Sequence, residues 1–230
     1  MADTPYILLS CGISLDGYLD DATSQRLVLS NAADLDRVDA VRAGCDAVLV
    51  GAGTVRADNP RLLVRSPERR SERLARSEGP TPAKVTLTAT GRLDATAHFF
   101  TTGDTPKLVY TASPGLTQAR SAVGAVSTVI DAGEPLDLLW VAKDLHSRGV
   151  RRLMVEGGGR TLTQFLTAGL ADQLDLVVAP LFVGDSRGRR FVADGEFPWN
   201  TGHRATLADV RQIGDVVLLR YALSTRFGPA

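Results

Sequence analysis

Short apolar runs alternate with amphipathic stretches along most of the chain, which is the pattern of sheet strands separated by helices. The first helix is predicted to begin after the N-cap candidates Ser30 and Asn31 and to end at Gly44. Two further helices are predicted where apolar residues recur at helical spacing, at 138–145 and at 162–166. The apolar runs predict strands at residues 6–9, 46–50, 61–65, 84–88, 107–111, 126–130, 151–155 and 174–179.

The last part of the chain changes character, because the segments 205–213 and 216–223 flank the turn pair Gly214-Asp215 and predict an antiparallel hairpin. Together the elements indicate an α/β fold in a single domain over residues 1–230. Its sheet is expected to be mixed and mostly parallel, flanked by helices, with a C-terminal antiparallel hairpin. Segment 66–82 is rich in Arg, Glu, Ser and Pro, so it is predicted to be a solvated, mobile loop.

Composition excludes several classes of protein. The chain has 230 residues, 44% hydrophobic and 23% charged, as in an ordinary globular protein. Its 26 basic side chains balance 26 acidic ones, so no overall field attracts nucleic acid and no such partner is expected. The His and Cys residues are too scattered for metal-ligand spacing, so no metal site is expected. The apolar runs are too short for a membrane span and no signal peptide is evident, so we expect no membrane association and a cytoplasmic location with Cys11 and Cys45 reduced.

Two glycine-rich turns, each between a predicted strand and a helix, are the strongest local signals for chemistry. The first is Gly51-Ala52-Gly53-Thr54, and the second is Gly157-Gly158-Gly159-Arg160-Thr161. At such a turn a phosphate can approach the backbone closely and meet the free N–H groups of the helix N-terminus. Neither has the full dinucleotide spacing, and a tight connection that needs positive φ is the structural alternative for each. The presence of two such turns in one chain favours a ligand that is a nucleotide with a pyrophosphate.

Three carboxylates lie where a mixed sheet opens its ligand cleft, namely Asp16 in the first loop, Asp58 just before Asn59-Pro60, and Glu156 at a strand end. Each has a plain structural alternative, namely a turn-stabilising role for the two aspartates and a solvated strand end for Glu156. Arg61 and Arg65 would share one face of a strand over 61–65, which suits a phosphate, although surface solvation is the usual state of an arginine.

The order of three motifs carries a family resemblance. Ser14-Leu15-Asp16-Gly17, then Val50-Gly51-Ala52-Gly53-Thr54 with Asp58-Asn59-Pro60-Arg61-Leu62 close behind, then Val155-Glu156-Gly157-Gly158 resemble the pyrimidine reductase of riboflavin biosynthesis. The resemblance spans about Tyr6 to the final hairpin. It implies a dihydrofolate-reductase-like fold, a homodimer and an NADPH-dependent oxidoreductase. The implied substrate is a phosphorylated small molecule, 5-amino-6-(5-phosphoribosylamino)uracil, whose ribosyl group is reduced to a ribityl group. The zinc deaminase motifs that often precede this domain are absent, so deamination is not expected.

The resemblance also implies roles for individual residues. Asp58 and Glu156 are the implied catalytic residues. The implied substrate-binding residues are Ser14, Asp16, Ser30, Arg61, Leu62 and Arg65. The implied cofactor-binding residues are Gly51, Gly53, Thr54, Thr88, Thr90, Arg92, Gly157, Gly158, Gly159, Arg160 and Thr161.

One departure from the family pattern bears on the substrate. The biosynthetic reductases commonly carry Lys or Arg after Ser-x-Asp-Gly, whereas this chain has Tyr18, which supplies no positive charge. A reductase of the same fold that acts on a pterin, on dihydrofolate or on a secondary metabolite is therefore an alternative. A catalytically silent NADPH-binding protein is another, although Asp58 and Glu156 beside intact glycine turns argue against it.

Overall fold

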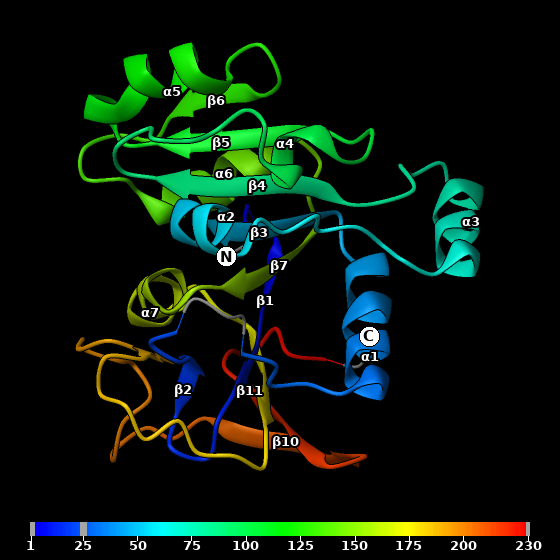
Figure 1. The fold of residues 1–230 in the computed structure, drawn as a ribbon, viewed down its shortest axis with the longest axis vertical. Helices are drawn as coiled ribbons and strands as arrows, with labels where there is room; N and C mark the ends of the chain where they lie inside the picture. The colour runs from blue at the N-terminus through cyan, green and yellow to red at the C-terminus, as the bar shows by residue number, and fades with distance from the viewer. Residues whose placement is uncertain (1–2, 24–26, 229–230) are drawn as a thin grey trace. The chain divides into compact units, whose positions relative to one another are not determined.

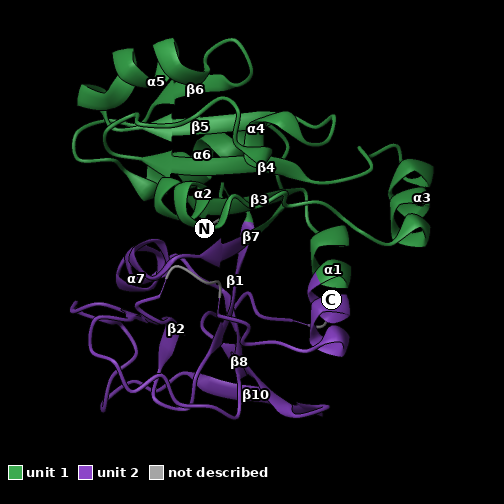
Figure 2. Cartoon of the chain, viewed as in Figure 1, with its two compact units in different colours: residues 1–5, 39–154 green, residues 6–38, 155–230 purple. Residues whose placement is uncertain are grey.

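The computed structural model describes residues 3–23 and 27–228, and its chain divides into two compact units (Figure 2). Unit 1 comprises Met1–Pro5 and Asp39–Met154, and unit 2 comprises Tyr6–Val38 and Val155–Ala230. Helix α1 (Ala32–Ala43) and strand β7 (Arg152–Gly157) each run from one unit into the other. The expectation of a single domain over 1–230 stays a prediction.

Unit 1 contains a parallel sheet in the order β3-β4-β5-β6, formed by β3 (Ala47–Gly51), β4 (Ala83–Thr88), β5 (Lys107–Thr111) and β6 (Thr128–Asp131). Strands β3 to β5 are nearly fully buried, as expected of parallel strands covered on both faces. Helix α2 (Ala52–Asp58) packs on β3 and β4, and α5 (Leu116–Val123) packs on β5 and β6. Helix α6 (Leu138–Ser147) buries the predicted apolar stripe.

Two predictions for unit 1 are wrong. Segment 66–82 is not an irregular loop, because it contains helix α3 (Pro67–Ala75), which Ser66 caps by accepting a hydrogen bond from the Arg69 N–H at 3.2 Å. The strand expected at 61–65 is absent, and Leu62 there has a φ of +50°, which is incompatible with a strand. The remaining short elements of this unit are α4 (His98–Thr101) and a 3₁₀ turn at Ser113–Gly115.

Unit 2 contains a mixed sheet in the order β10-β11-β8-β1 (Figure 1). Strand β1 (Tyr6–Ile13) pairs in parallel with β8 (Gln173–Val178), and β11 (Val216–Ala222) pairs antiparallel with both β8 and β10 (Thr206–Ile213). Helix α7 (Gly159–Thr167) follows β7. A separate two-stranded sheet joins β2 (Tyr18–Asp20) to β9 (Arg189–Arg190). The predicted fold class is confirmed, including the C-terminal antiparallel hairpin.

Candidate active site

The second glycine turn has the geometry of a phosphate-binding helix start. Gly157 ends β7 with a φ of +115°, and α7 begins at Gly159 with no side chain capping its N-terminus. The first-turn N–H groups of α7 therefore lack a side-chain acceptor, and the helix dipole favours an anion at this end. A Cβ added to Gly157 would meet only the Leu162 side chain, at 3.8 Å, so the space beside this glycine is open. The arrangement fits a dinucleotide phosphate.

The neighbouring glycine has a different reason for lacking a side chain. A Cβ added to Gly159 would lie 2.5 Å from the Arg190 carbonyl oxygen, so strand β9 lies directly against the start of α7. Thr161 is buried in the first turn of this helix, whereas Arg160 is exposed. The two-stranded sheet of β2 and β9 therefore forms part of the surroundings of the second glycine turn.

The loop after β1 is held by Asp16. Its carboxylate accepts a hydrogen bond from the Ser14 hydroxyl at 2.5 Å and from the N–H groups of Val183 and Gly184 at 3.0 and 2.8 Å. These bonds, with the Ser14 hydroxyl first, lower the pKa of the Asp16 carboxyl from 3.8 to about 2. Ser14 is fully buried, and its Oγ also accepts from the Tyr18 N–H at 3.0 Å. Both residues act in this geometry as loop-fixing groups, and substrate binding by them stays a prediction.

The first glycine turn lies in unit 1. Gly51 ends the buried strand β3, and α2 starts immediately after it without a side-chain cap. Gly53 is exposed, and a Cβ added to it would meet nothing within 4 Å. Thr54 is half-buried on the same short helix. The backbone here is accessible, as a cofactor-binding turn requires.

The loop after β4 lies beside α2, because the Arg56 guanidinium donates a hydrogen bond to the Arg92 carbonyl oxygen at 2.9 Å. Thr88 is buried, and its hydroxyl accepts from the Gly91 N–H at 3.1 Å. Thr90 and Arg92 are exposed. Unit 1 thus groups the first glycine turn with the residues expected to contact a 2′-phosphate, and of that set Thr90 and Arg92 have accessible side chains.

The turn after α2 is held by a side-chain contact of Asn59. Asn59 adopts a left-handed conformation, with φ +43°, and its side-chain oxygen accepts from the His98 N–H at 2.6 Å. Asp58 is exposed at the end of α2. Leu62 is buried, so it supports the loop from below, whereas Arg61 is exposed. Because 61–65 is not a strand, the argument that Arg61 and Arg65 share a strand face fails.

Arg65 is oriented by a buried carboxylate. Asp39 accepts hydrogen bonds from the Arg65 and Ser66 N–H groups at 2.5 and 3.1 Å, and the Arg65 Nε lies 3.6 Å from its Oδ1. The Arg69 guanidinium also donates to Asp39, at 3.0 Å. These contacts outweigh burial and lower the pKa of the Asp39 carboxyl. The Arg65 side chain is still 54% exposed, so Asp39 orients it without burying it.

The remaining predicted residues lie in unit 2. The Ser30 hydroxyl, just before α1, donates to the Asp34 carboxylate at 2.5 Å. Glu156 is half-buried in β7, next to Gly157. Among the described residues no group of His, Cys, Asp and Glu side chains is arranged to hold a metal ion. No helix within residues 3–23 and 27–228 has the length and apolar content needed to cross a membrane.

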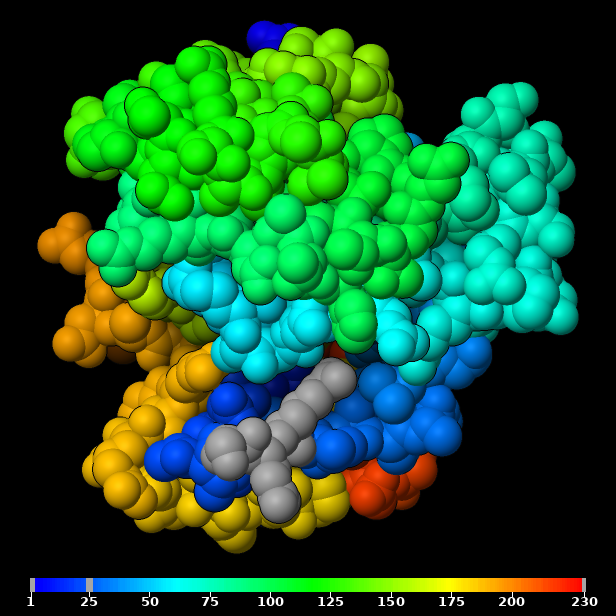
Figure 3. Space-filling model, turned by 45° about the horizontal axis from the view of Figure 1, so that its top comes forward, coloured from blue at the N-terminus to red at the C-terminus, as the bar shows by residue number. Residues whose placement is uncertain are grey.

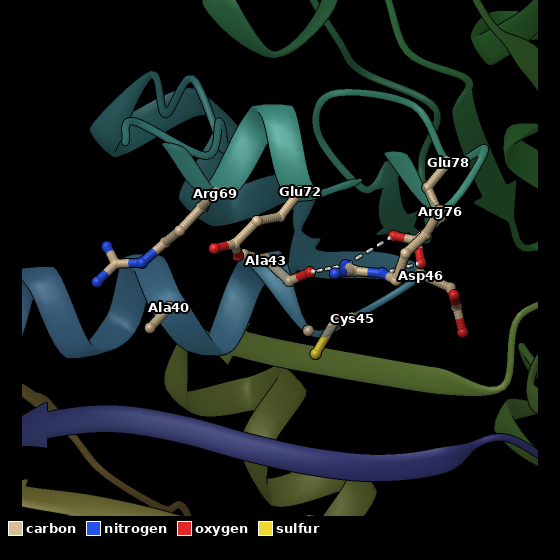
Figure 4. A pocket seen from close by; sticks show the side chains of 9 residues that line it. Ala40, Ala43, Cys45, Asp46, Arg69, Glu72, Arg76 and Glu78 are labelled. Atoms are coloured by element: carbon tan, nitrogen blue, oxygen red, sulfur yellow. Dashed lines mark hydrogen bonds and ion pairs between the residues drawn. The ribbon is translucent and has the colours of Figure 1, made fainter. Parts of the chain in front are cut away.

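One pocket of the described structure is lined by none of the predicted site residues. It is a cavity of about 380 Å³ in unit 1, lined by α1, α3 and the chain between α1 and β3 (Figure 4). The Arg76 guanidinium lies across it, between the Ala43 carbonyl and the Glu78 carboxylate. These polar groups bond to one another, so we interpret the cavity as a packing gap beneath α3 and not as a binding site.

The sequence analysis missed the contact of Tyr18 with Arg190. The Arg190 guanidinium lies 5.0 Å from the centre of the Tyr18 ring and donates a hydrogen bond to the Tyr18 hydroxyl at 3.2 Å. A cluster of arginines at 187–190 was the available signal, but no predicted strand placed it. The partners are 172 residues apart, so only the fold could join them.

The fold is that of the dihydrofolate-reductase-like reductases of the riboflavin pathway. The chain is similar to RibD of Acinetobacter baumannii, with 25% identity, a TM-score of 0.76, and coverage of 96% of this chain and 58% of that one. It is also similar to a pyrimidine reductase-like protein of Corynebacterium diphtheriae, with 22% identity, a TM-score of 0.79, and coverage of 96% and 92%.

Sequence comparison identifies the family. Residues 5–219 match the model of the RibD C-terminal domain, and the chain belongs to this family. A relative in Archaeoglobus fulgidus, named 2,5-diamino-6-ribosylamino-4(3H)-pyrimidinone 5′-phosphate reductase, is 33% identical over 84% of this chain and 87% of its own length. The reductase of the same name in Methanothermobacter thermautotrophicus is 34% identical over 84% and 85%. The expected family and enzyme class, an oxidoreductase, are confirmed.

Proposed function

We propose that this protein is an NADPH-dependent reductase that converts the ribosyl group of a phosphorylated ribosylamino-pyrimidine to a ribityl group in riboflavin biosynthesis. The observation that carries the proposal is the uncapped glycine turn at the start of α7, in a chain that is 33% identical to a reductase of such a substrate over 87% of that reductase's length. The turn fits a dinucleotide phosphate, and the relatives supply the substrate class.

The chemistry is the reduction of a C=N bond. In the open-chain form of the substrate, C1 of the sugar is doubly bonded to the amino nitrogen, and that carbon would accept the hydride that a reduced nicotinamide supplies when bound. The nitrogen then takes up one proton. Asp58, exposed at the end of α2, is the proposed group that orients or protonates the reacting end, with Glu156 as the other candidate acid.

Arg65 is proposed to bind the phosphate of the substrate. Asp39 fixes the Arg65 backbone and holds its Nε at 3.6 Å, so the half-exposed guanidinium is pre-oriented. A guanidinium held in this way loses less side-chain entropy on binding a phosphate than a freely rotating one. Arg65→Ala is therefore expected chiefly to raise the KM for the substrate.

Two forms of the substrate differ at C2 of the pyrimidine. The archaeal relatives are named for the 2,5-diamino form, whereas the sequence resemblance predicted the uracil form, which carries an oxygen at C2. We propose the diamino form as the preferred substrate because those two relatives share 33% and 34% identity with this chain. The choice rests on similarity, so the experiment must include both.

The test is NADPH oxidation with the diamino compound, the uracil compound, dihydrofolate and a panel of small carbonyl compounds. Turnover of either ribosylamino-pyrimidine supports the proposal. Turnover of dihydrofolate or of a carbonyl compound alone would move the protein to the alternative that Tyr18 suggests. A chain that binds NADPH but fails to oxidise it in a single turnover with any of them would be the silent binding protein.

Asp58→Asn separates a chemical role from a structural one. The substitution keeps the shape of the side chain but removes the acid, so kcat should fall by about 10²–10⁴-fold with KM little changed. The turn itself is fixed by Asn59, whose side chain accepts from His98, and should persist. A variant that keeps most of its kcat leaves Glu156 as the candidate acid.

The preference for NADPH over NADH has a separate basis. The exposed Thr90 and Arg92, in the loop that Arg56 ties to α2, are the proposed contacts of the 2′-phosphate. A phosphate contact to a cation contributes roughly 1.5–3 kcal/mol, or about one to two decades in affinity. Fluorescence titration of both cofactors is the measurement, and equal dissociation constants would contradict the assignment.

The proposal includes a homodimer in the cytoplasm. Strand β10 is an edge strand of unit 2, with Leu207 and Val210 half exposed, and an apolar edge of this kind is commonly covered by a second copy. Light scattering that gives the 24.5 kDa monomer at micromolar concentration would exclude the dimer. Cys11 and Cys45 form no disulfide in the described part of the chain, which fits a reducing compartment, and cell fractionation tests the location.

A further inference from the structure

Three arginines lie close together around β9, and they differ in how their charges are balanced. The Arg187 guanidinium is paired with Asp185 at 2.7 Å, and Arg189 lies 3.9 Å from Asp20. Arg190 has no carboxylate partner among the described residues; its guanidinium instead meets the ring and hydroxyl of Tyr18. Arg190 therefore retains a positive charge that the protein does not neutralise.

The position of Arg190 is fixed by its contacts with Tyr18. Tyr18 is only 5% exposed, so its ring is a fixed platform, and the two residues are directly paired across β2 and β9. A cation over an aromatic face gains attraction while keeping its outer N–H groups for other partners. The segment with β9, drawn in gold, lies at the surface beside the dark blue segment with β2 (Figure 3).

A second cation without a side-chain partner in the described structure follows Gly159, the residue whose backbone lies against Arg190. Arg160 lies in the first turn of α7, is exposed, and has no ion pair or hydrogen bond among the described residues. A cation in this position is unfavourable for the helix dipole. Gly159, which precedes it, is the residue at which an added Cβ would lie 2.5 Å from the Arg190 carbonyl oxygen. Two unneutralised guanidinium groups thus come from adjacent backbone at the second glycine turn.

We propose that Arg190, held on the ring of Tyr18, is a specificity-determining residue that binds a phosphate group of the ligands of this reductase. The inference rests on the proposed function for its ligands, which are the diphosphate of the cofactor and the phosphate of the sugar. It assigns to Arg190 the positive charge that Tyr18 itself lacks, and Tyr18 is the positioning residue.

The central experiment compares Arg190→Gln with Arg187→Gln. The two variants lose the same charge from the same segment, but Arg187 is already paired with Asp185 and its side chain is 81% exposed. The NADPH dissociation constant, from fluorescence titration, and the substrate KM are measured for both. Arg190→Gln should raise one of these constants by about 10–100-fold, whereas Arg187→Gln should leave both within twofold.

The two measured constants identify which phosphate Arg190 binds. A change in the NADPH dissociation constant alone assigns Arg190 to the cofactor, and a change in KM alone assigns it to the substrate. In the second case the parent's preference for the phosphorylated substrate over its dephosphorylated riboside should shrink in Arg190→Gln, and the part that remains is what the proposed Arg65 contact contributes. If both variants leave both constants within twofold of the parent, Arg190 binds no phosphate and the proposal is wrong.

A measurement without turnover separates this inference from the proposed function. Inorganic pyrophosphate should raise the unfolding temperature of the parent and of Arg187→Gln more than that of Arg190→Gln, even if no pyrimidine is reduced. Equal rises in all three proteins would overturn the role of Arg190. For the platform, Tyr18→Phe keeps the ring and should keep most of the effect, whereas Tyr18→Leu should behave like Arg190→Gln.

Discussion

Helices α6 and α3 lie in the same unit but are attached by opposite means. Helix α6 buries Leu138, Val141, Ala142 and Leu145, each at most 9% exposed, in the way that an amphipathic helix usually packs. Helix α3 leaves its one leucine, Leu74, 57% exposed and buries Arg73, which is 3% exposed. The Arg73 guanidinium donates to the carbonyl oxygens of Ala43, Cys45 and Gly79 at 2.8, 2.8 and 2.9 Å.

The difference shows that a guanidinium can replace an apolar stripe when carbonyl groups lie in the right places. Arg73 satisfies backbone oxygens around the end of α1, and Glu78, 3.0 Å away, partly balances its charge. Burial lowers the pKa of the Arg73 guanidinium from 12.5, but an arginine stays protonated at physiological pH. Helix α3 therefore depends on a few directional contacts, whereas α6 depends on buried area.

The largest effect is expected from the apolar helix. Leu145 is fully buried, so Leu145→Ala should destabilise the protein by about 2–5 kcal/mol through the lost transfer free energy and the cavity left behind. Chemical denaturation followed by circular dichroism measures the change. Leu139→Ala on the same helix is the matched control, because Leu139 is 38% exposed and should lose much less. Equal losses would mean that helix propensity and not burial holds α6.

The second prediction concerns the buried arginine. Arg73→Met keeps much of the length of the side chain but removes the guanidinium donor from the Cys45 and Gly79 carbonyl oxygens. It leaves the Ala43 oxygen with only the 3.3 Å bond from Arg76, and these losses together should cost about 2–3 kcal/mol. The loss should be local: amide hydrogen exchange should accelerate in α3 before it does in β3 or β4. Arg73→Lys should recover only part of the stability, because an ammonium cannot match the fork of the guanidinium. Unchanged exchange in α3 would show that Arg73 does not dock the helix.

The same contrast explains what the sequence could predict. The apolar period of α6 is local, and so are the two glycine turns, so both were found from the residues alone. Helix α3 was predicted to be a loop because its docking partners are backbone oxygens around 43–45 and 79, which no side-chain pattern records. The short helix α5 at Leu116–Val123 was not predicted either.

The candidate site shows the same limit. Asp16 was noticed as a carboxylate in a loop, but its partners Val183 and Gly184 are 167 and 168 residues away. The stack of Arg190 on Tyr18 was invisible for the same reason. Residue types near predicted strand ends could be named as candidates, whereas which of them fix loops and which have accessible side chains required the fold.

A third prediction uses a buried cation that can lose its proton. Lys84 in β4 is fully buried, and its Nζ donates to the carbonyl oxygens of Phe99 and Thr102 at 3.1 and 2.5 Å. Burial lowers the pKa of the Lys84 ammonium from 10.5 to about 8. Between these values the unfolded chain binds more protons than the folded one, so the contribution of Lys84 to the free energy of unfolding rises with pH.

The measurement is the difference in unfolding free energy between the parent and Lys84→Met at several values of pH from 7 to 10.5. Relative to the variant, the parent should gain stability above about pH 8, with a slope of at most about 1.4 kcal/mol per pH unit. Below that pH the difference should be flat. A difference that falls as pH rises would show that the charged form of Lys84 is favoured by the fold, contrary to the effect of burial.

The smallest effect is expected from the exposed arginine beside the buried one. The Arg76 side chain is 50% exposed, and its Nε lies 2.8 Å from the Glu78 carboxylate. Exposed ion pairs contribute little, because water and salt screen them and two long side chains must be ordered. Arg76→Met should therefore shift the denaturation midpoint far less than Arg73→Met, and raised salt should remove most of what difference remains. The pair of variants tests what holds α3. If Arg76→Met were as damaging as Arg73→Met, the helix would depend on its total positive charge and not on the buried guanidinium, and its contrast with α6 would concern charge and not directional hydrogen bonding.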